Sequence, residues 1–492
     1  MYYISTRGGS EKKTSARVIK QGLAEDGGLF VPESIPTVSK DFIKKLAEED
    51  YAHRAADVLS LYLTDYTYDE LLSAATDAYK EESFGKYAAP VKSLDKTHKV
   101  LELWHGPTCA FKDMALQIMP RLLSTALKKT GEKRTALILV ATSGDTGKAA
   151  LEGYKDVDGV KIMVFYPEDG VSDIQKLQMA SQEGENVNVC AIKGNFDDAQ
   201  TGVKQIFSDT NIAKELDEKG YFLSSANSIN WGRLAPQIVY YFSAYCDLMN
   251  AGDITLGDEI DVCVPTGNFG NIFAAYLAKR MGLPVRRFIC ASNVNNVLTD
   301  FINTGIYDRN RQFHTTISPS MDILISSNLE RLLWLIQGEE KTAECMKLLK
   351  ETGKYEVSAE VREKIASEFI GCFASDDETK QTIAETFEKH RYLIDTHTAV
   401  ALFAAKKNAT DIPVVTASTA SPYKFAADVL SALTGNRDNG NDFFRILREL
   451  NAKTGAAVPR PLAALENKTR RFTTSVGKSK DEMFAEVAKF AD

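Results

Sequence analysis

The sequence has 492 residues, 44% hydrophobic and 26% charged, which is typical of a folded chain long enough for more than one lobe. The net charge of −8 disfavours nucleic acid as the main partner, and no apolar run is long enough to predict a membrane span. Seven cysteines are scattered singly without a CxxC pair, so we expect reduced thiols in a cytoplasmic protein and no metal site.

In chain order, a short strand and several helices come first, which predicts an N-terminal domain over residues 1–92. Short apolar runs then alternate with helices, a pattern typical of parallel sheets covered by helices. We therefore predict an α/β protein with two parallel-sheet lobes, at 93–225 and 226–430. Residues 328–394, charge-rich and helical in pattern, are expected to form a solvated insertion, and 431–492 a closing segment of loops.

The first unusual motif is HGPTCAFKD, whose residues 105–112 we call the lysine loop. Apolar residues recur at helical spacing from Phe111 onward, which predicts a long helix with Thr108 as its N-cap and a kink at Pro120. Lys112 would then lie near the positive end of the helix dipole. This position and partial burial favour a neutral amine, as imine chemistry requires. The alternative is an ordinary surface lysine at a helix start.

The next motif, SGDTGK at 143–148, follows the apolar run TALILVAT. It is not a nucleotide P-loop, because that pattern requires glycine in place of Thr142 and a hydroxyl residue in place of Ala149. No GxGxxG fingerprint follows a strand either, which argues against a nicotinamide-dependent oxidoreductase. What remains is a loop of hydroxyl and N–H groups suited to a carboxylate, and we call residues 143–146 the carboxylate loop.

Two later turns have a similar position after strands. In VPTGNFGNI, the turn at 267–271, here the glycine loop, precedes a helix and could cradle a phosphate with backbone N–H groups, although tight packing explains such glycines equally well. In VVTASTASPYKF, four hydroxyl residues lie where parallel sheets bind ligands, at the carboxyl ends of strands. Capping of the helix near Tyr423 would explain one of them.

Taken together and in this order, HGPTCAFKD, SGDTG, NSINWGR, VPTGNFGN and STASPYKF resemble threonine synthases of the long bacterial and fungal type. YYISTRG, GLAEDGGLFVP and DTHTAVA extend the resemblance over essentially the entire chain. It implies a fold type II pyridoxal 5'-phosphate enzyme that converts O-phospho-L-homoserine and water into L-threonine and phosphate.

The resemblance also implies roles for residues. Lys112 matches the lysine that forms the Schiff base with the cofactor, and Thr419 the hydroxyl residue beside the pyridine nitrogen. Asp145 departs from the asparagine common in the wider fold type, so we expect backbone and hydroxyl groups to bind the carboxylate. The remaining matches are to the cofactor-phosphate loop (Gly267, Asn268, Phe269, Gly270, Asn271), the substrate-carboxylate loop (Ser143, Gly144, Asp145, Thr146) and the substrate-phosphate site (Asn227, Ser228, Arg233).

Several points stay open at this stage. His105, Asp113 and His397 lie in family motifs without an assigned chemistry, and Lys424 is either a phosphate ligand or an exposed helix residue. A phospholyase that releases 2-oxobutyrate and ammonia, or a catalytically silent relative, would carry nearly the same motifs. The sequence does not distinguish a monomer from a dimer.

Overall fold

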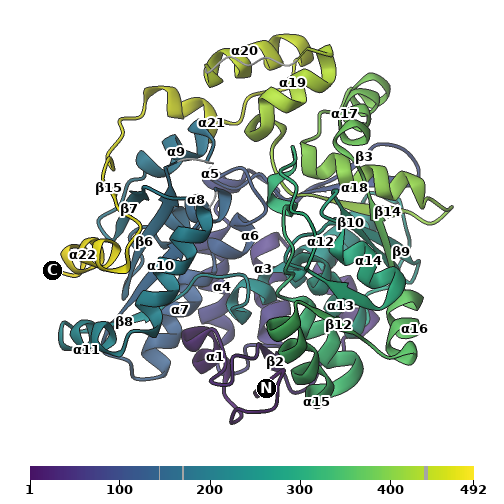
Figure 1. Cartoon of the computed structure of the whole chain (residues 1–492). Coiled ribbons are helices and arrows are strands. Elements are labelled where there is room, and N and C mark those ends of the chain that lie inside the picture. The colour runs from purple at the N-terminus through teal and green to yellow at the C-terminus, as the bar shows by residue number, and fades with distance from the viewer. Residues whose placement is uncertain (143, 169–170, 437–441) are drawn as a thin grey trace.

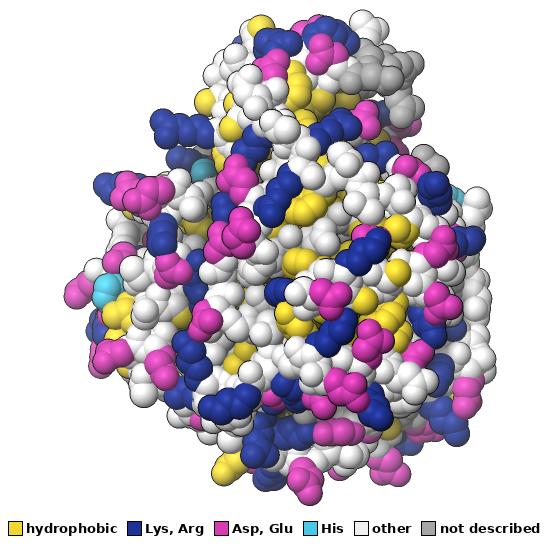
Figure 2. All heavy atoms as spheres, turned by 90° about the vertical axis from the view of Figure 1, so that its left-hand side faces the viewer, with side chains coloured by type: hydrophobic (Ala, Val, Ile, Leu, Met, Phe, Trp, Pro, Cys, Tyr) yellow, Lys and Arg dark blue, Asp and Glu magenta, His cyan; other side chains and the backbone are white. Residues whose placement is uncertain are grey.

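The computed structural model describes residues 1–142, 144–168, 171–436 and 442–492. The chain forms two sheets of mainly parallel strands with helices packed around them (Figure 1), as the apolar runs predicted. Basic and acidic side chains intermingle over the face shown in Figure 2, without a large patch of one sign. Among the helices of the described ranges, none combines the length and the apolarity that a bilayer crossing requires.

The first sheet has five parallel strands in the order β15-β7-β6-β5-β8. Its inner strands are buried on both faces, which explains their continuous apolar sequences. The elements are β5 (Thr135–Ala141), α8 (Asp145–Tyr154), β6 (Val160–Pro167), α9 (Asp173–Ala180), β7 (Val187–Ile192), α10 (Phe196–Ser208), α11 (Thr210–Glu218), β8 (Tyr221–Ser224) and β15 (Ser475–Val476).

The second sheet has six strands in the order β13-β10-β9-β14-β4-β3, of which only the edge strand β3 is antiparallel. Strand β4 pairs with β14 here, although the boundary expected at residue 93 groups it with the other lobe. The elements are β3 (Val91–Ser93), β4 (His98–Glu102), β9 (Ile260–Pro265), α13 (Gly270–Met281), β10 (Val285–Ser292), α14 (Val297–Thr304), β13 (Phe369–Phe373), α18 (Thr396–Lys407) and β14 (Val414–Ser418).

The N-terminal segment packs on α12 (Trp231–Asn250), the most deeply buried long helix. Helix α12 is apolar on nearly every face because α2, α3, α6 and α13 surround it. The N-terminal elements are β1 (Tyr3–Ser5), α1 (Ser15–Gln21), β2 (Phe30–Pro32), α2 (Lys40–Ala47), α3 (Tyr51–Ser60), α4 (Tyr68–Ala78) and α5 (Glu81–Phe84), with β1 and β2 paired antiparallel.

The long helix predicted from Phe111 is instead two helices, α6 (Asp113–Leu116) and α7 (Met119–Lys129). Pro120 is the second residue of α7, where its missing N–H group costs nothing, so it begins a helix and does not kink one. The apolar spacing continues through the break because Ile118, which lies between the two helices, is itself buried, and periodicity alone could not reveal the break.

The region 328–394 is not a purely helical insertion. It holds α15 (Leu329–Thr352), β12 (Lys354–Glu356), α16 (Ala359–Glu368) and α17 (Asp376–His390), and β12 pairs with β11 (Ile306–Asp308). It also supplies β13, the edge strand that pairs in parallel with β10. The sequence did not reveal β13 because its five residues lie between charged helices and its partner is about eighty residues away in the chain.

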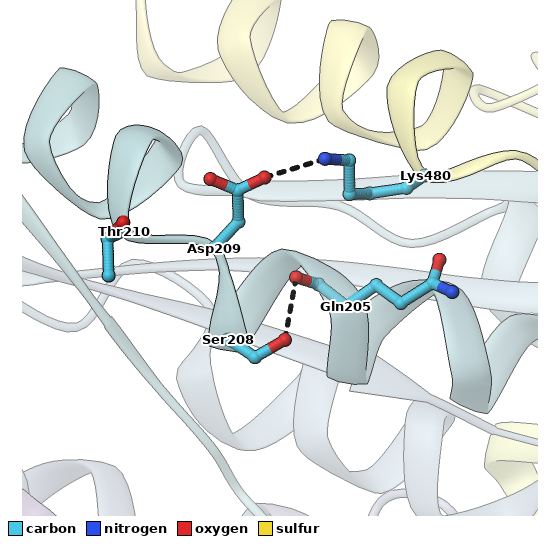
Figure 3. Close-up of a pocket in the computed structure, with 5 residues that line it drawn as sticks. All are labelled: Gln205, Ser208, Asp209, Thr210 and Lys480. Atoms are coloured by element: carbon cyan, nitrogen blue, oxygen red, sulfur yellow. Dashed lines mark hydrogen bonds and ion pairs between the residues drawn. The ribbon is translucent and has the colours of Figure 1, made fainter.

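The C-terminal segment crosses from the six-stranded sheet to the five-stranded one. It is more regular than the loops expected from sequence, with α19 (Ala426–Thr434), α20 (Phe443–Thr454), α21 (Arg460–Ala463) and α22 (Lys480–Ala491). Helix α22 packs on α10, and Lys480 pairs with Asp209 at 2.6 Å beside a surface pocket (Figure 3). That pocket contains none of the predicted site residues.

A close approach between α8 and α6 gives a stability prediction. A Cβ atom on Gly153 would lie 1.9 Å from the carbonyl oxygen of Leu116, a backbone atom that cannot rotate away as a flexible side chain could. Helix propensity alone would make Gly153→Ala stabilising by about 1 kcal/mol. We expect the overlap to dominate and to destabilise the protein by about 1–3 kcal/mol. Thermal unfolding monitored by circular dichroism checks the sign, and an unchanged or higher midpoint would contradict this packing.

Candidate active site

Lys112 lies at the junction between the lysine loop and α6. Its side chain is half-buried, and its amine makes no hydrogen bond or ion pair with any residue that the structure describes. Burial lowers the pKa of Lys112, assisted by the charges of Lys424 and Arg233 and opposed by Asp145 and Asp113. Because α6 is a single turn, burial is the main cause and not the long helix dipole expected from sequence. The amine is therefore biased toward its neutral, nucleophilic form.

The lysine loop is held from within by Asp113. This buried carboxylate accepts hydrogen bonds from the N–H and the hydroxyl group of Thr108, each at 2.8 Å. Burial raises the pKa of Asp113 to about 6, although the Thr108 hydrogen bonds act against the shift. The prediction that Thr108 caps the helix is wrong, because Lys112 occupies the N-cap position and the Thr108 hydroxyl is committed to Asp113.

The lysine loop also contacts the segment after β14. The N–H group of Phe111 donates to the carbonyl oxygen of Thr419 at 2.8 Å, and the N–H group of Ser421 donates to that of Cys109 at 3.0 Å. Thr419 is 7% exposed. These two bonds fix the distance between Thr419 and the backbone next to Lys112. Ser421 caps the short helix Pro422–Phe425, so the capping alternative explains one of the four hydroxyl residues.

The carboxylate loop lies at the start of α8, directly after β5. Ser143 falls outside the described residues, whereas Gly144 and Asp145 are buried and Thr146 is half-buried. The Asp145 carboxylate is 2.6 Å from the Lys424 amine and accepts a hydrogen bond from Gln175 at 3.0 Å. Burial opposes ionisation of Asp145, but the charges of Lys424 and Lys112 outweigh it and hold the pKa of Asp145 well below its usual range. The interpretation of Lys424 as an exposed helix residue is wrong, because its side chain is 1% exposed.

The glycine loop leads into α13, and no described side chain caps the N-terminus of this helix. Phe269 adopts a left-handed conformation with φ of 61°, and its ring packs 5.9 Å from that of Phe369. The carbonyl oxygen of the Asn271 side chain accepts hydrogen bonds from Tyr240, at 2.8 Å, and from Tyr241. Its Nδ2 group is buried and has no partner among the described residues. The loop thus presents uncapped N–H groups and one unpaired amide donor.

The glycine loop is supported from behind by the turn at Pro319–Met321. A Cβ atom on Gly267 would lie 2.8 Å from the carbonyl oxygen of Ser320, so this position leaves no room for a side chain. The N–H group of Ser320 donates to His397 Nε2 at 3.1 Å, and His397 Nδ1 is 2.8 Å from Asp395. His397 is buried and supports this turn.

Arg233 lies in the first turn of α12. Asn230 caps this helix by accepting the N–H group of Gly232 at 2.8 Å. The Arg233 guanidinium donates to the carbonyl oxygen of Ala226 at 2.5 Å, but its Nε has no partner among the described residues. Burial lowers the pKa of Arg233 to about 10, and no carboxylate of the described chain pairs with it. Of the two residues predicted to act with it, Asn227 is exposed and Ser228 half-buried.

Asn328 and Arg331, at the start of α15, were missed by sequence reasoning. The backbone and side-chain N–H groups of Asn328 both donate to the carbonyl oxygen of Asn268 at 3.0 Å. The buried Arg331 side chain donates to the carbonyl oxygens of Phe30, at 3.0 Å, and Ile229, at 2.6 Å. They therefore connect the glycine loop, the segment before Arg233 and the N-terminal domain. Nothing in a charge-rich helical sequence distinguishes these two residues from solvated ones.

His105 makes a structural contact. Its Nε2 is 2.8 Å from Glu102, which also accepts a hydrogen bond from the Tyr392 hydroxyl at 2.5 Å. The His105 ring stacks on Trp104 with centroids 4.4 Å apart. His105 therefore holds the start of the lysine loop against Glu102 at the end of β4.

Three family models match the chain in order. "Threonine synthase N terminus" covers residues 2–79, "Pyridoxal-phosphate dependent enzyme" covers 100–416, and "Threonine synthase, C-terminal" covers 398–484. The second of these spans more than half of the sequence. The chain belongs to the threonine synthase family. The fold type II architecture and the pyridoxal phosphate cofactor expected from the sequence motifs are thereby confirmed.

Relatives in this family are similar over most of the chain. Human "Threonine synthase-like 1" is 42% identical over 452 residues, covering 88% of this chain, and the chain spans 60% of the length of that relative. "Threonine synthase" of Pseudomonas aeruginosa is 40% identical, covering 88% of this chain and 91% of its own. The crystal structure of PLP-bound threonine synthase from Brucella melitensis superposes with a TM-score of 0.89 at 36% identity, covering 100% and 99% of the two chains.

The residues present fit pyridoxal phosphate. An aldehyde requires an uncharged amine, and Lys112 is biased toward that state and has no hydrogen-bond or ion-pair partner in the described chain. A phosphate requires convergent N–H donors, which the uncapped start of α13 and the unpaired Asn271 amide provide. The site thus has a nucleophilic amine for the aldehyde of the cofactor and hydrogen-bond donors for its phosphate.

Proposed function

We propose that this chain is a threonine synthase, which converts O-phospho-L-homoserine and water into L-threonine and phosphate. The observation that supports it most is the buried Arg233, a cation without a carboxylate partner in the described chain. A buried unpaired charge is costly, so its presence indicates an anionic ligand. The relatives named threonine synthase in Pseudomonas and in fungi, at 36–40% identity, point to the same product, threonine.

In this proposal, Lys112 holds the cofactor covalently, Gly267, Asn268, Phe269, Gly270 and Asn271 hold its phosphate, and Thr419 lies at its ring nitrogen. When bound, pyridoxal phosphate delocalises the negative charge that develops on the carbon atoms of the substrate. A hydroxyl group at Thr419 does not hold the ring nitrogen protonated as a carboxylate would, which limits that delocalisation. The backbone hydrogen bond from the N–H group of Phe111 to the carbonyl oxygen of Thr419 holds Thr419 at a fixed distance from the residue next to Lys112.

Lys112 is the proposed proton carrier. Its neutral amine accepts the proton from Cα of the substrate and, once that proton has been passed on, one from Cβ; one proton is returned at Cγ and a second at Cα before threonine leaves. The C–O bond at Cγ breaks with departure of phosphate, and water supplies the hydroxyl group at Cβ and one proton. The net change is one water consumed and one phosphate released, and the pKa of Lys112, lowered by burial, makes the amine available for the first step.

Arg233, with Asn227 and Ser228, is proposed to bind the substrate phosphate. The unpaired Nε of Arg233 can form one arm of a bidentate contact. Ser143, Gly144, Asp145 and Thr146 are proposed to hold the α-carboxylate through backbone and hydroxyl groups. Such contacts would hold the substrate between Lys112 and the start of α12.

Product analysis tests the proposal directly. Purified protein loaded with pyridoxal phosphate is incubated with O-phospho-L-homoserine, and organic and inorganic products are quantified by NMR. We expect threonine and phosphate in equal amounts. Formation of 2-oxobutyrate and ammonia in their place would identify a phospholyase, and cofactor binding without turnover would identify a catalytically silent relative.

We also propose a cytoplasmic location for this reaction. All seven cysteines are buried free thiols, which is typical of a reducing compartment.

A further inference from the structure

The most unusual polar contact near the site is the ion pair between Lys424 and Asp145. The side chains are 1% and 4% exposed, and their charged atoms are 2.6 Å apart. Asp145 begins α8 of the five-stranded sheet, whereas Lys424 follows β14 of the six-stranded sheet. The pair therefore joins the carboxyl ends of the two sheets, and both of its charges act on the amine of Lys112.

The Lys424 amine makes a second contact. It donates to the carbonyl oxygen of Thr108 at 3.0 Å, in the lysine loop. One amine thus connects the carboxylate loop, the lysine loop and the segment that carries Thr419. The side-chain amide of Gln175, on α9, donates to the same oxygen of Asp145 at 3.0 Å, so this oxygen is saturated with donors.

The position of Asp145 creates an electrostatic problem for the proposed substrate. Resting on the proposed function, the carboxylate loop must accept an α-carboxylate, and a second unpaired carboxylate there would repel it. A neutral asparagine would avoid this conflict. We propose that Lys424 is a positioning residue that neutralises Asp145, so that the backbone and hydroxyl donors of residues 144–146 can receive the carboxylate of an amino acid.

The charges around the site agree with this assignment. Lys112 has no ion pair in the described chain and Arg233 has no carboxylate, so neither compensates Asp145 by direct contact. Asp113 is engaged with Thr108. Lys424 is therefore the one described cation in contact with Asp145.

The test is a set of three variants, Lys424→Met, Asp145→Asn and the double variant. Lys424→Met leaves Asp145 uncompensated and should raise KM for O-phospho-L-homoserine on the order of 100-fold, with a smaller effect on kcat. Adding Asp145→Asn removes the repulsion and should recover at least tenfold of that loss. A double variant no better than Lys424→Met, or a Lys424→Met KM within threefold of wild type, would overturn the proposal. If Lys424→Met does not fold, the double variant decides alone. A KM close to that of wild type would support the proposal, and a KM raised as far as expected for Lys424→Met would overturn it.

A matched control exists on the same helix. Lys148, also buried, pairs with Glu152 at 3.0 Å within α8. Lys148→Met and its double variant with Glu152→Gln should change the unfolding temperature while KM stays within a fewfold of wild type. A KM increase equal to that of Lys424→Met would show that any buried pair in α8 has this effect, and would overturn a specific role.

A binding measurement separates this inference from the proposed function. L-threonine and L-threoninamide differ in carboxylate charge, and their binding is followed by the absorbance of bound pyridoxal phosphate. Wild-type protein should prefer L-threonine, Lys424→Met should reduce that preference at least tenfold, and the double variant should restore it. This result would support the inference even if wild-type protein released no threonine. An unchanged preference in Lys424→Met would overturn it even if wild-type protein were a threonine synthase.

Discussion

Lys112→Ala is expected to reduce turnover by about 10⁴-fold or more, because the variant loses both the covalent link to the cofactor and the proton carrier. The other buried amine near it, Lys424, is committed to Asp145 and Thr108 and cannot replace it. Borohydride treatment followed by peptide mass spectrometry should find the reduced cofactor on the Lys112 peptide of wild-type protein and on no peptide of the variant. Lys148→Met, which removes a different buried lysine, should retain both the link and turnover. Turnover by Lys112→Ala would refute the assignment.

The pH dependence of cofactor loading reports the same amine. Only neutral Lys112 attacks an aldehyde, so the rate at which the cofactor-free protein takes up pyridoxal phosphate should rise with pH and level off above the pKa of Lys112. Because burial lowers that pKa, the plateau should begin at a lower pH than for an ordinary lysine. Lys424→Met should move it to higher pH, since Lys424 contributes to the lowering.

The strands were the most predictable part of the fold. Residues 135–141 and 160–167 are apolar on both faces, so the sequence itself marks them as buried parallel strands. Strand β13 could not be found this way because its burial depends on a distant partner, β10. The break after α6 was hidden for a related reason, since Ile118 and Met119 are themselves buried and continue the apolar pattern.

The part of the site that could be predicted consists of residues whose type and place in a loop after a strand already suggest their chemistry. Lys112 and the glycine loop stand out by residue type and by position after strands. Lys424, Asn328 and Arg331 do not, because each makes contacts with segments sixty or more residues away. Sequence reasoning identified the unexpected charge of Asp145 but not the lysine that compensates it, since charge pairing is a property of the folded chain.

Arg233→Met is expected to raise KM for O-phospho-L-homoserine by roughly 10²–10³-fold, because the phosphate loses a buried charged partner. The affinity for pyridoxal phosphate, measured by titration of the cofactor-free protein, should stay within a fewfold of wild type. Inorganic phosphate should raise the unfolding temperature of wild-type protein and not that of Arg233→Met. An unchanged KM would remove Arg233 from the substrate site.

The stability of Arg233→Met is equally informative. The pKa of Arg233 is lowered by burial to about 10, so the folded state disfavours the charged form and the cation destabilises the ligand-free protein. Replacing it with a neutral side chain should therefore leave the unfolding temperature unchanged or higher, while KM rises. Arg54 provides the matched contrast, since it is a buried arginine that pairs with Asp247 at 2.7 Å. Arg54→Met leaves a carboxylate unpaired and should lower the unfolding temperature without a change in KM. The opposite signs expected for two buried arginines distinguish a cation retained for a ligand from one retained for the fold.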